Sequence, residues 1–203
     1  MKYVIFNTEK VYPSKIVCIG RNYVDHIMEL GNNIPEQMVI FLKPNSAIST
    51  DIISGKEDTV HYEGEISFLI NSGEISGIGF GLDLTKRGVQ KSLKTNGLPW
   101  ERAKAFDNSA VFSDFVAFNG SINDLRLELF INGKLTQSGS CELMLNKPEA
   151  ILNEVKSFLT FEDGDLIMTG TPKGVGPVNQ GDEFTGKIYD GEKLLIETSW
   201  IAR

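Results

Sequence analysis

Two glutamates stand two positions apart in the stretch "VHYEGEISFLI", residues 60–70, which the sequence predicts to be a β-strand. Side chains alternate between the faces of a strand, so Glu63 and Glu65 share one face with Ser67, while the apolar side chains share the other. An isolated E-x-E of this kind is most often a solvated face. The alternative is that both carboxylates bind a cation, and the two glutamates alone do not decide between these interpretations.

A third acid, Asp83, lies in the glycine-rich apolar stretch "GFGLDL". Aspartate is disfavoured inside strands, and burying its charge unpaired is costly. Asp83 therefore either ends the strand and caps the following helix or faces Glu63 and Glu65. In the second case three oxygen ligands converge with no histidine or thiolate near them in sequence. Such a set suits Mg²⁺ or Mn²⁺, with Ca²⁺ as a further candidate.

Clustered carboxylates repel one another without their cation. The sequence therefore predicts that Asp83→Asn weakens Mg²⁺ binding and raises the stability of the metal-free protein.

His26 and Glu29 are three positions apart in "GRNYVDHIMEL", so on a helix they share a face and can meet. A carboxylate beside an imidazole can fix its tautomer, and the pair can take a proton from water. A solvated surface helix is the commoner outcome for this spacing. However, His26 is one of only two histidines, and the polar cluster that begins at Arg21 directly follows an apolar strand. The segment is therefore a candidate acid–base site.

Two further stretches are weaker signals. Lys104, in "GLPWERAKAFD", is by default a solvated charge. The loop "TGTPKGVGPV", residues 169–178, is rich in glycine and proline and follows a predicted strand. Such a loop can turn successive backbone N–H groups inward to bind an anion, although most loops of this composition are only turns.

Composition limits the partners. The chain has 203 residues, 41% hydrophobic residues and a formal net charge of −7, which argues against nucleic acid or an anionic membrane as the main partner. No apolar run approaches the length of a transmembrane span. Cys18 and Cys141 fit neither a disulfide framework nor a metal knuckle, so a reducing cytoplasm is the default compartment.

Strand patterns dominate the chain. The predicted strands cover residues 15–19, 65–70, 77–84, 125–131, 165–170 and 193–200. Hairpin turns are predicted at Asn132-Gly133 and Asp190-Gly191. Three helices are predicted, over residues 22–32, 85–97 and 147–160, the first two ended by Gly31 and Gly97. This pattern predicts an α+β, β-rich protein, a mixed rolled β-sheet with a few short covering helices, in one domain over residues 1–203.

Taken together, these stretches resemble the fumarylacetoacetate hydrolase family, most closely its acylpyruvate hydrolase and oxaloacetate decarboxylase branch. The matching strings occur in the family's order from about residue 15 to about residue 190, nearly the whole chain. They are "GRNYVDHIMELGN", "FLKPNSAI", "HYEGEISFLI", "LDLTKRGVQ", "GLPWERAKAFD", "NGKLTQSG" and "TGTPKGVGPV".

The resemblance implies roles for the residues singled out. The implied roles are metal ligation by Glu63, Glu65 and Asp83, water activation by His26 and Glu29 on a lid that orders over bound ligand, catalysis by Lys104 and Gln90, and substrate binding by Arg21, Arg87 and Thr171. The resemblance also implies the β-sheet roll of the family's C-terminal domain, a homodimer and a small 2-oxo acid substrate.

Two departures from the family pattern affect substrate choice. Close relatives of the acylpyruvate hydrolase type carry a longer loop between the E-x-E strand and the aspartate strand, so one side of the pocket or of the dimer surface is expected to be trimmed. Many relatives also have an acid where this chain has Gly88.

The first interpretation is Mg²⁺- or Mn²⁺-dependent hydrolysis of an acylpyruvate to pyruvate and a carboxylic acid. In it the cation stabilises the departing enolate, the dyad deprotonates water, and Lys104 with Gln90 stabilises the oxyanion. The alternatives that use the same site are decarboxylation of oxaloacetate and tautomerisation or isomerisation of a 2-oxo acid. A non-catalytic β-roll stiffened by Ca²⁺ belongs to another class, and it leaves His26, Glu29 and Lys104 unexplained.

Overall fold

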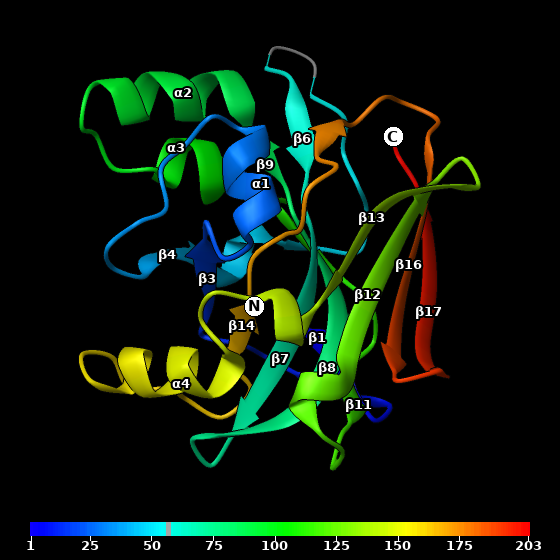
Figure 1. The fold of residues 1–203 in the computed structure, drawn as a ribbon. Coiled ribbons are helices and arrows are strands. Elements are labelled where there is room, and N and C mark those ends of the chain that lie inside the picture. The colour runs from blue at the N-terminus through cyan, green and yellow to red at the C-terminus, as the bar shows by residue number, and fades with distance from the viewer. Residues whose placement is uncertain (56–57) are drawn as a thin grey trace.

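The computed structural model describes residues 1–55 and 58–203, and it confirms a β-rich fold with a curled mixed sheet and a few short helices (Figure 1). The largest sheet has the order β4–β3–β14–β7–β8–β10–β5, with β11 also paired to β8. Its strands are β3 (Lys15–Gly20), β4 (Val39–Pro44), β5 (Ile48–Ser49), β7 (Gly64–Asn71), β8 (Glu74–Asp83), β10 (Ala110–Phe112), β11 (Val116–Ala117) and β14 (Leu166–Met168).

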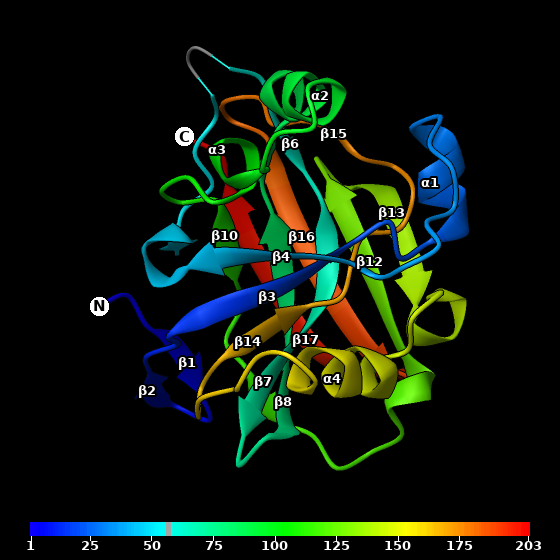
Figure 2. The same ribbon diagram turned by 90° about the vertical axis from the view of Figure 1, so that its left-hand side faces the viewer.

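A second, antiparallel sheet of order β13–β12–β16–β17 lies behind β3, β4 and β14 in Figure 2. Its strands are β12 (Leu125–Ile131), β13 (Lys134–Ser140), β16 (Glu183–Asp190) and β17 (Lys193–Ile201). Two small sheets complete the β-structure. One contains β6 (Val60–Tyr62), β9 (Thr85–Lys86) and β15 (Gly176–Pro177). The other contains β1 (Val4–Phe6) and β2 (Glu9–Val11).

The helices lie outside the strands. They are α1 (Val24–Glu29), α2 (Arg87–Thr95), α3 (Glu101–Lys104) and α4 (Pro148–Lys156), with short 3₁₀ turns η1 (Asn45–Ala47), η2 (Ile122–Asp124) and η3 (Cys141–Leu143). In Figure 1, α2 and α3 lie above the sheets near β6 and β9, while α4 lies near the opposite end. None of the described helices is long and apolar enough to cross a membrane.

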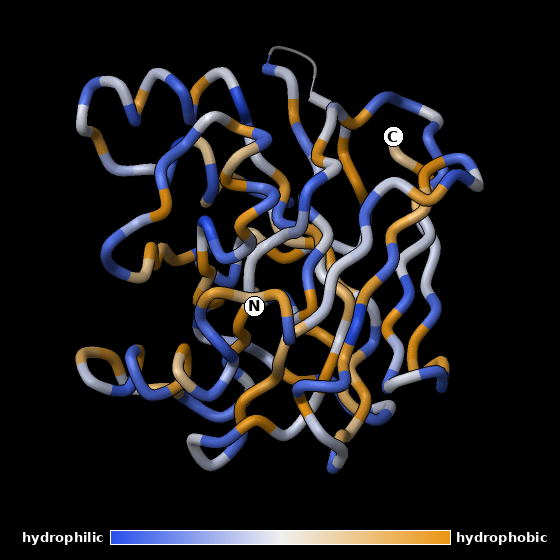
Figure 3. The backbone as a smooth tube through the Cα atoms, in the orientation of Figure 1, coloured by the Kyte–Doolittle hydropathy of each residue, from blue (hydrophilic) through white to orange (hydrophobic). Residues whose placement is uncertain are grey.

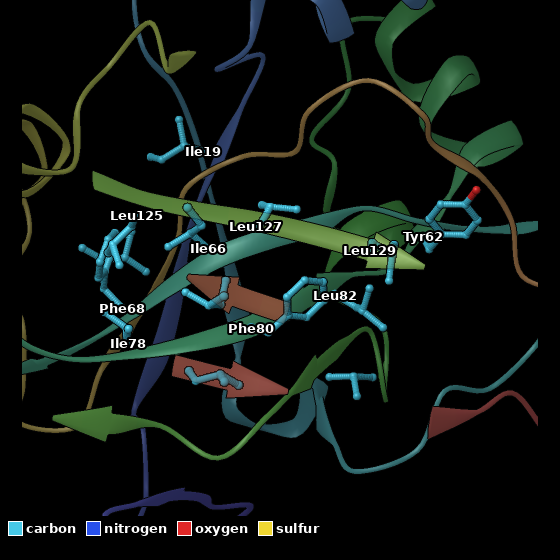
Figure 4. Close-up of a cluster of buried hydrophobic side chains, with 14 of the residues drawn as sticks. Ile19, Tyr62, Ile66, Phe68, Ile78, Phe80, Leu82, Leu125, Leu127 and Leu129 are labelled. Carbon is cyan, nitrogen blue, oxygen red and sulfur yellow. The ribbon is translucent and has the colours of Figure 1, made fainter. Parts of the chain in front are cut away.

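The main core lies between the two large sheets. Ile66 and Phe68 of β7 and Phe80 of β8 face Leu127 and Leu129 of β12, and all five side chains are fully buried (Figure 4). Burying a side chain of this size contributes roughly 1.5–3 kcal/mol. Figure 3 shows the same arrangement, with hydrophobic residues concentrated on the central strands and the outer helix α2 largely hydrophilic.

Strand β7 is also buried on its other face. A second apolar cluster there includes Cys18, Leu69 and Met168. The side chains that alternate with the main core are therefore removed from water as well. This arrangement places the E-x-E glutamates in a buried setting rather than on a solvated face.

The predicted strands and helices are present, with shifts at their ends. Asn132 and Gly133 form the β12–β13 turn with positive φ values of 50° and 74°. The last hairpin is shifted by one residue, because Asp190 still pairs with Lys193. Helix α1 is shorter than its predicted range of 22–32.

The short connection between the E-x-E strand and the aspartate strand is the tight turn Ser72–Gly73, between β7 and β8. This turn lies at the far ends of both strands from Glu65 and Asp83. The short connection therefore lies away from the acidic end of these strands, and the trimming of another side of the pocket or of the dimer surface stays a prediction.

Asp165, just before β14, is a buried carboxylate that joins the N-terminal segment to the core. It accepts hydrogen bonds from the Ser14 amide (3.0 Å), the Ser14 hydroxyl (2.7 Å) and the amides of Lys15 (3.1 Å) and Glu162 (2.9 Å), and it pairs with the Lys15 ammonium. Burial opposes its charge, but the hydrogen bonds from Lys15, Glu162 and Ser14 outweigh burial and hold the pKa of Asp165 below its usual value.

We expect Asp165→Asn to lower the free energy of unfolding by about 2–4 kcal/mol at neutral pH, because charge-assisted bonds to a buried group are lost. A depressed pKa contributes stability that is present above the unfolded-state pKa of about 4 and is lost as pH falls through the folded-state value. Urea unfolding of wild type, Asp165→Asn and the exposed control Asp107→Asn at neutral and acid pH checks this. Equal losses in both variants would contradict it.

Candidate active site

The three acids singled out by the sequence converge at one end of β7 and β8. Glu63 directly precedes β7, Glu65 lies within it, and Asp83 ends β8; the Asp83 amide donates to the Glu63 carbonyl at 2.9 Å. One carboxylate oxygen of each acid lies within 4.8 Å of the others. Their exposed fractions are only 6%, 1% and 1%. The solvated-face interpretation of the E-x-E is therefore wrong. Asp83 does end its strand, but it does not cap α2, whose N-cap is Lys86.

Two buried lysines neutralise part of this acidic cluster. Lys104, at the end of α3, places its ammonium 2.8 Å from Glu63 Oε2, 2.6 Å from Asp83 Oδ2 and 2.6 Å from Thr85 Oγ1. Lys43, in β4, is fully buried, with its ammonium 2.9 Å from Asp83 Oδ1 and 3.0 Å from the Ser109 carbonyl. The default expectation that Lys104 is a solvated charge is wrong.

Arg87, the first residue of α2, joins the acids to the helix. Its guanidinium pairs with Glu63 Oε1 at 2.5 Å and donates to Gln90 Oε1 at 2.8 Å. Arg87 and Gln90 are three positions apart, so they lie on the same face of α2. The structure therefore brings both predicted residues to the acidic cluster.

The charges of the cluster are unevenly compensated. Burial, followed by the charges of Asp83 and Glu63, raises the pKa of Glu65 well above its usual value. Burial would also raise the pKa of Glu63, but Lys104 and Arg87 outweigh it and lower that pKa. The same two acids, Asp83 and Glu63, overcome burial to raise the pKa of Lys104.

This donor set fits a divalent cation. Three carboxylates supply only hard oxygen ligands, and the raised pKa of Glu65 shows that the neighbouring lysines do not offset burial and the like charges around it, as a bound cation would. Burial raises the pKa of the nearby Cys18 thiol. Among the described residues, Cys18 is not one of the side chains whose ligand atoms converge here. The three carboxylates could hold such an ion. Its positive charge would repel the Lys104 ammonium, which bonds two of the three acids.

His26 and Glu29 meet on α1 as the spacing predicts. His26 Nδ1 lies 3.2 Å from Glu29 Oε2, and His26 is 6% exposed. The carboxylate of Glu29 favours a proton on Nδ1, which leaves Nε2 as the basic nitrogen of a neutral imidazole. The dyad is partly buried and not a solvated surface pair.

The glycine-rich loop that follows β14 turns its amides toward the chain's own carboxylates. The Gly170 amide donates to Glu65 Oε2 at 2.7 Å, and the Gly174 amide donates to Glu29 Oε1 at 3.0 Å. Both glycines have positive φ, 96° and 102°, and a Cβ at Gly174 would lie 2.2 Å from the Thr136 carbonyl oxygen. The loop thus positions one of the acids and the dyad together.

Thr171 lies in the same loop, and its hydroxyl is held by Gln137 of β13. Gln137 Oε1 accepts from the Gly64 amide (2.9 Å), so its amide nitrogen is the group that donates to the Thr171 hydroxyl (2.8 Å) and the Pro172 carbonyl (2.9 Å). The Thr171 hydroxyl then donates to the Gly64 carbonyl at 2.9 Å. Its single proton is therefore used within the protein, which leaves an oxygen lone pair for other contacts.

A small cavity of about 40 Å³ lies beside these groups. Among its lining residues are Arg21, His26, Glu63, Arg87, Gln90 and Lys104, together with Lys94, Phe41 and Trp100. Typical ligand pockets are roughly 300–1,000 Å³. The cavity is therefore too small for an organic substrate unless part of its wall moves.

Two contributors were not found by sequence reasoning, Lys43 and Gln137. Each lies in a quoted string, "FLKPNSAI" or "NGKLTQSG", but neither string marks the residue as buried. The one local signal was a lysine within the apolar strand stretch of β4.

Comparisons with known proteins agree over most of the chain. A family model described as fumarylacetoacetate (FAA) hydrolase C-terminal matches residues 15–198. The protein named oxaloacetate tautomerase YcgM, from Escherichia coli (strain K12), is 40% identical over 203 residues, covering 90% of this chain and 92% of that protein.

Solved structures are similar over the same length. A candidate fumarylacetoacetate isomerase/hydrolase from Oleispira antarctica matches with a TM-score of 0.93 and 37% identity, covering 100% of both chains. Fumarylpyruvate hydrolase from Pseudomonas aeruginosa, solved in complex with Mn²⁺ and pyruvate, matches with a TM-score of 0.89 and 26% identity, covering 100% of this chain and 96% of that one.

Proposed function

The chain belongs to the fumarylacetoacetate hydrolase family, and from that premise we propose that it is a metal-dependent enzyme whose primary activity is tautomerisation of oxaloacetate. The observation that supports this most is the buried set of three carboxylates beside His26. The chain that carries them is 40% identical to a protein named oxaloacetate tautomerase. Residues 1–203 would act as one catalytic domain.

Glu63, Glu65 and Asp83 are the proposed ligands of Mg²⁺ or Mn²⁺, with Ca²⁺ a less suitable ion. A divalent cation held there supplies a Lewis acid that stabilises the enolate form of a 2-oxo acid. Mn²⁺ is supported by its presence in the structure of fumarylpyruvate hydrolase.

His26 is the proposed base. Its Nδ1 is bonded to Glu29, so Nε2 is the nitrogen available to the cavity that His26 lines. In tautomerisation, His26 Nε2 would take a proton from C3 of the keto form, and the imidazolium so formed would give that proton to the C2 oxygen, which yields the enol and restores the neutral imidazole. No carbon–carbon bond breaks and no water is consumed. Glu29 stabilises the imidazolium that forms.

The remaining site residues are proposed to bind the substrate. Lys104 and Gln90 would stabilise negative charge on its oxygens, and Arg87 would orient its carboxylate. Thr171 is proposed to lie against the same carboxylate. Its hydroxyl proton is already given to Gly64, so its contact with an anion would need the backbone amide or a rotated hydroxyl.

Acylpyruvate hydrolysis is the second candidate, supported by the similarity to fumarylpyruvate hydrolase. Here the dyad would deprotonate water instead of a substrate carbon. The sequence favoured this reaction, but the 40% identity to an oxaloacetate tautomerase reverses that preference. Decarboxylation of oxaloacetate would form the same pyruvate enolate as acylpyruvate hydrolysis, but without an attacking water.

The deciding experiment offers three substrates to the Mg²⁺-loaded protein. Loss of the enol absorbance of oxaloacetate reports tautomerisation, and pyruvate release from oxaloacetate, acetylpyruvate and fumarylpyruvate reports the other two reactions. We expect enol–keto conversion to be the fastest. Faster pyruvate release from an acylpyruvate would make hydrolysis the main activity, and no turnover with any of them would favour the metal-stabilised binding protein.

We predict that the segment from Arg21 to about Gln37 is a lid. The cavity is only about 40 Å³, residues 31–37 are mostly exposed, and the outer ion pair Asp25–Lys173 (2.8 Å) is solvated and contributes little. Only Ile27 is fully buried on α1. Hydrogen exchange of amides 24–37 should therefore be fast, and Mg²⁺ with oxalate should slow it, while the β7 amides serve as the control. Strong protection already present without ligand would show that α1 is a fixed wall.

We also propose that the chain works as a cytoplasmic homodimer. Strand β4 is an edge of the large sheet, and Leu42 and Leu98 are exposed in an apolar groove that lies along it. A second copy would cover this edge. Light scattering should give twice the chain mass of 22.5 kDa, and Leu42→Glu should shift the protein toward the monomer. A monomeric wild type would contradict the proposal.

A further inference from the structure

Two cations on the cavity wall have no acidic partner among the residues that the structure describes. Arg21 and Lys94 both line the cavity, and within the described parts of the chain neither lies within 4.0 Å of a carboxylate oxygen. The Lys94 ammonium donates only to the neutral Asn32 Oδ1, at 2.8 Å. The three other cations at the site, Lys43, Arg87 and Lys104, are each paired with Glu63 or Asp83. In a chain of net charge −7, two unpaired neighbouring cations need an explanation.

Keeping these cations in place is unfavourable for the protein alone. Burial, and then the like charges of Arg21 and Arg87, lower the pKa of Lys94. Arg21 has a left-handed backbone, with φ of +55°, which costs about 1–2 kcal/mol for a residue other than glycine. Strain and unpaired charge of this kind persist mainly at sites that bind a ligand.

The geometry of α2 places Lys94 away from the acids. Arg87, Gln90 and Lys94 are spaced by three and four residues, so they lie on one face of the helix. Arg87 contacts Glu63, and Lys94 is about 10 Å farther along the helix at 1.5 Å per residue. The lysine side chain can reach back along part of that distance. The cavity therefore runs from the carboxylate cluster at one end to Lys94 and Asn32 at the other.

We propose that Arg21 and Lys94 form a distal anion subsite that binds a second carboxylate of the substrate, so that the site selects dianionic 2-oxo acids over monoanionic ones. This inference rests on the proposed function and specifies its substrate class. The 2-oxo acid group of the substrate would bind at the acidic end, where the divalent cation is proposed. A second carboxylate some carbons away would then pair with Arg21 and Lys94 at the other end of the cavity. Oxaloacetate and fumarylpyruvate have this form, whereas acetylpyruvate ends in a methyl group.

A structural role for Lys94 predicts a different outcome. If Lys94 only holds Asn32, and with it the segment that follows α1, its loss would weaken all ligands equally. A distal subsite instead predicts a loss confined to ligands with a second carboxylate. A matched pair of stable ligands separates the two: 2-oxoglutarate and 2-oxopentanoate have the same chain length and 2-oxo acid group, and only the first has the terminal carboxylate.

The experiment measures the dissociation constants of this pair by calorimetry in saturating Mg²⁺, for wild type, Lys94→Met and Arg21→Gln. Lys134→Met is the control, because Lys134 is exposed in β13 and lines neither this cavity nor the hollow beside it. We expect wild type to bind 2-oxoglutarate at least tenfold more tightly than 2-oxopentanoate. Lys94→Met should lose roughly tenfold for 2-oxoglutarate and less than twofold for 2-oxopentanoate, and Lys134→Met should match wild type.

Two further measurements keep the result decisive. Oxalate has no distal group, so unchanged oxalate binding shows that a variant keeps an intact site, and Lys94→Arg should restore the preference if Lys94→Met folds poorly. Equal losses for both 2-oxo acids, or no preference in wild type, would overturn the subsite. The proposed function fails separately from the subsite. A dianion preference without turnover of oxaloacetate or acylpyruvates would support the subsite and contradict the proposed reaction. Turnover without the preference would support the reaction and contradict the subsite.

Discussion

Glu29→Gln is expected to reduce oxaloacetate tautomerisation and acylpyruvate hydrolysis by roughly 10²–10⁴-fold, the range for loss of a positioned acid–base group. Glu29 accepts from His26 Nδ1 and from the Gly174 amide. A glutamine oxygen can keep one of these bonds, but it cannot stabilise an imidazolium. Its amide nitrogen can also bond Nδ1 and place the proton on Nε2, which removes the basic nitrogen from the cavity.

The same variant should leave decarboxylation nearly intact. Loss of CO₂ from oxaloacetate requires stabilisation of the enolate, to which the proposed metal ligands and Lys104 contribute, but no base at His26. We therefore expect Mg²⁺-dependent pyruvate release from oxaloacetate to stay within about tenfold of wild type. Parallel assays of the three reactions check this, with Glu36→Gln as a control, since Glu36 is an exposed acid on the same segment. Equal loss of all three reactions would end this division of roles.

The parts of the site that the sequence indicated depend on local geometry. Alternation along a strand placed Glu63 and Glu65 on one face, and helical spacing placed His26 beside Glu29. Both relations hold within a few residues, so they need no knowledge of the fold. The meeting of Asp83 with the glutamates needed the β7–β8 register, and the sequence left that open.

The parts that the sequence did not indicate depend on contacts between distant segments. Lys43 is fixed by Asp83 and by the carbonyls of Leu84 and Ser109, which are 40–66 positions away in sequence. Gln137 reaches residues that are 34–73 positions away. A lone lysine or glutamine in a strand is ordinarily solvent-facing, and only the packed sheets show that these two are surrounded by hydrogen-bond partners.

Asp83→Asn is expected to weaken Mg²⁺ binding by roughly 100-fold, about 2.8 kcal/mol, because one of three proposed charged ligands is lost. Its effect on the metal-free protein depends on the two lysines. Repulsion among the acids alone predicted a gain in stability, but Asp83 pairs with Lys104 at 2.6 Å and with Lys43 at 2.9 Å. Neutralising it leaves Lys43 without a carboxylate in a fully buried position.

We therefore expect the opposite sign for stability. Removing one partner of a buried ion pair costs roughly 3–5 kcal/mol, and asparagine keeps one acceptor oxygen, so we expect Asp83→Asn to lower the free energy of unfolding by about 3 kcal/mol. Urea unfolding in the presence of a chelator measures this change in the free energy of unfolding, and calorimetry measures the loss of Mg²⁺ affinity. Asp114→Asn removes an exposed carboxylate and is the control. A metal-free variant more stable than wild type would show that repulsion among Glu63, Glu65 and Asp83 outweighs their pairing with the lysines.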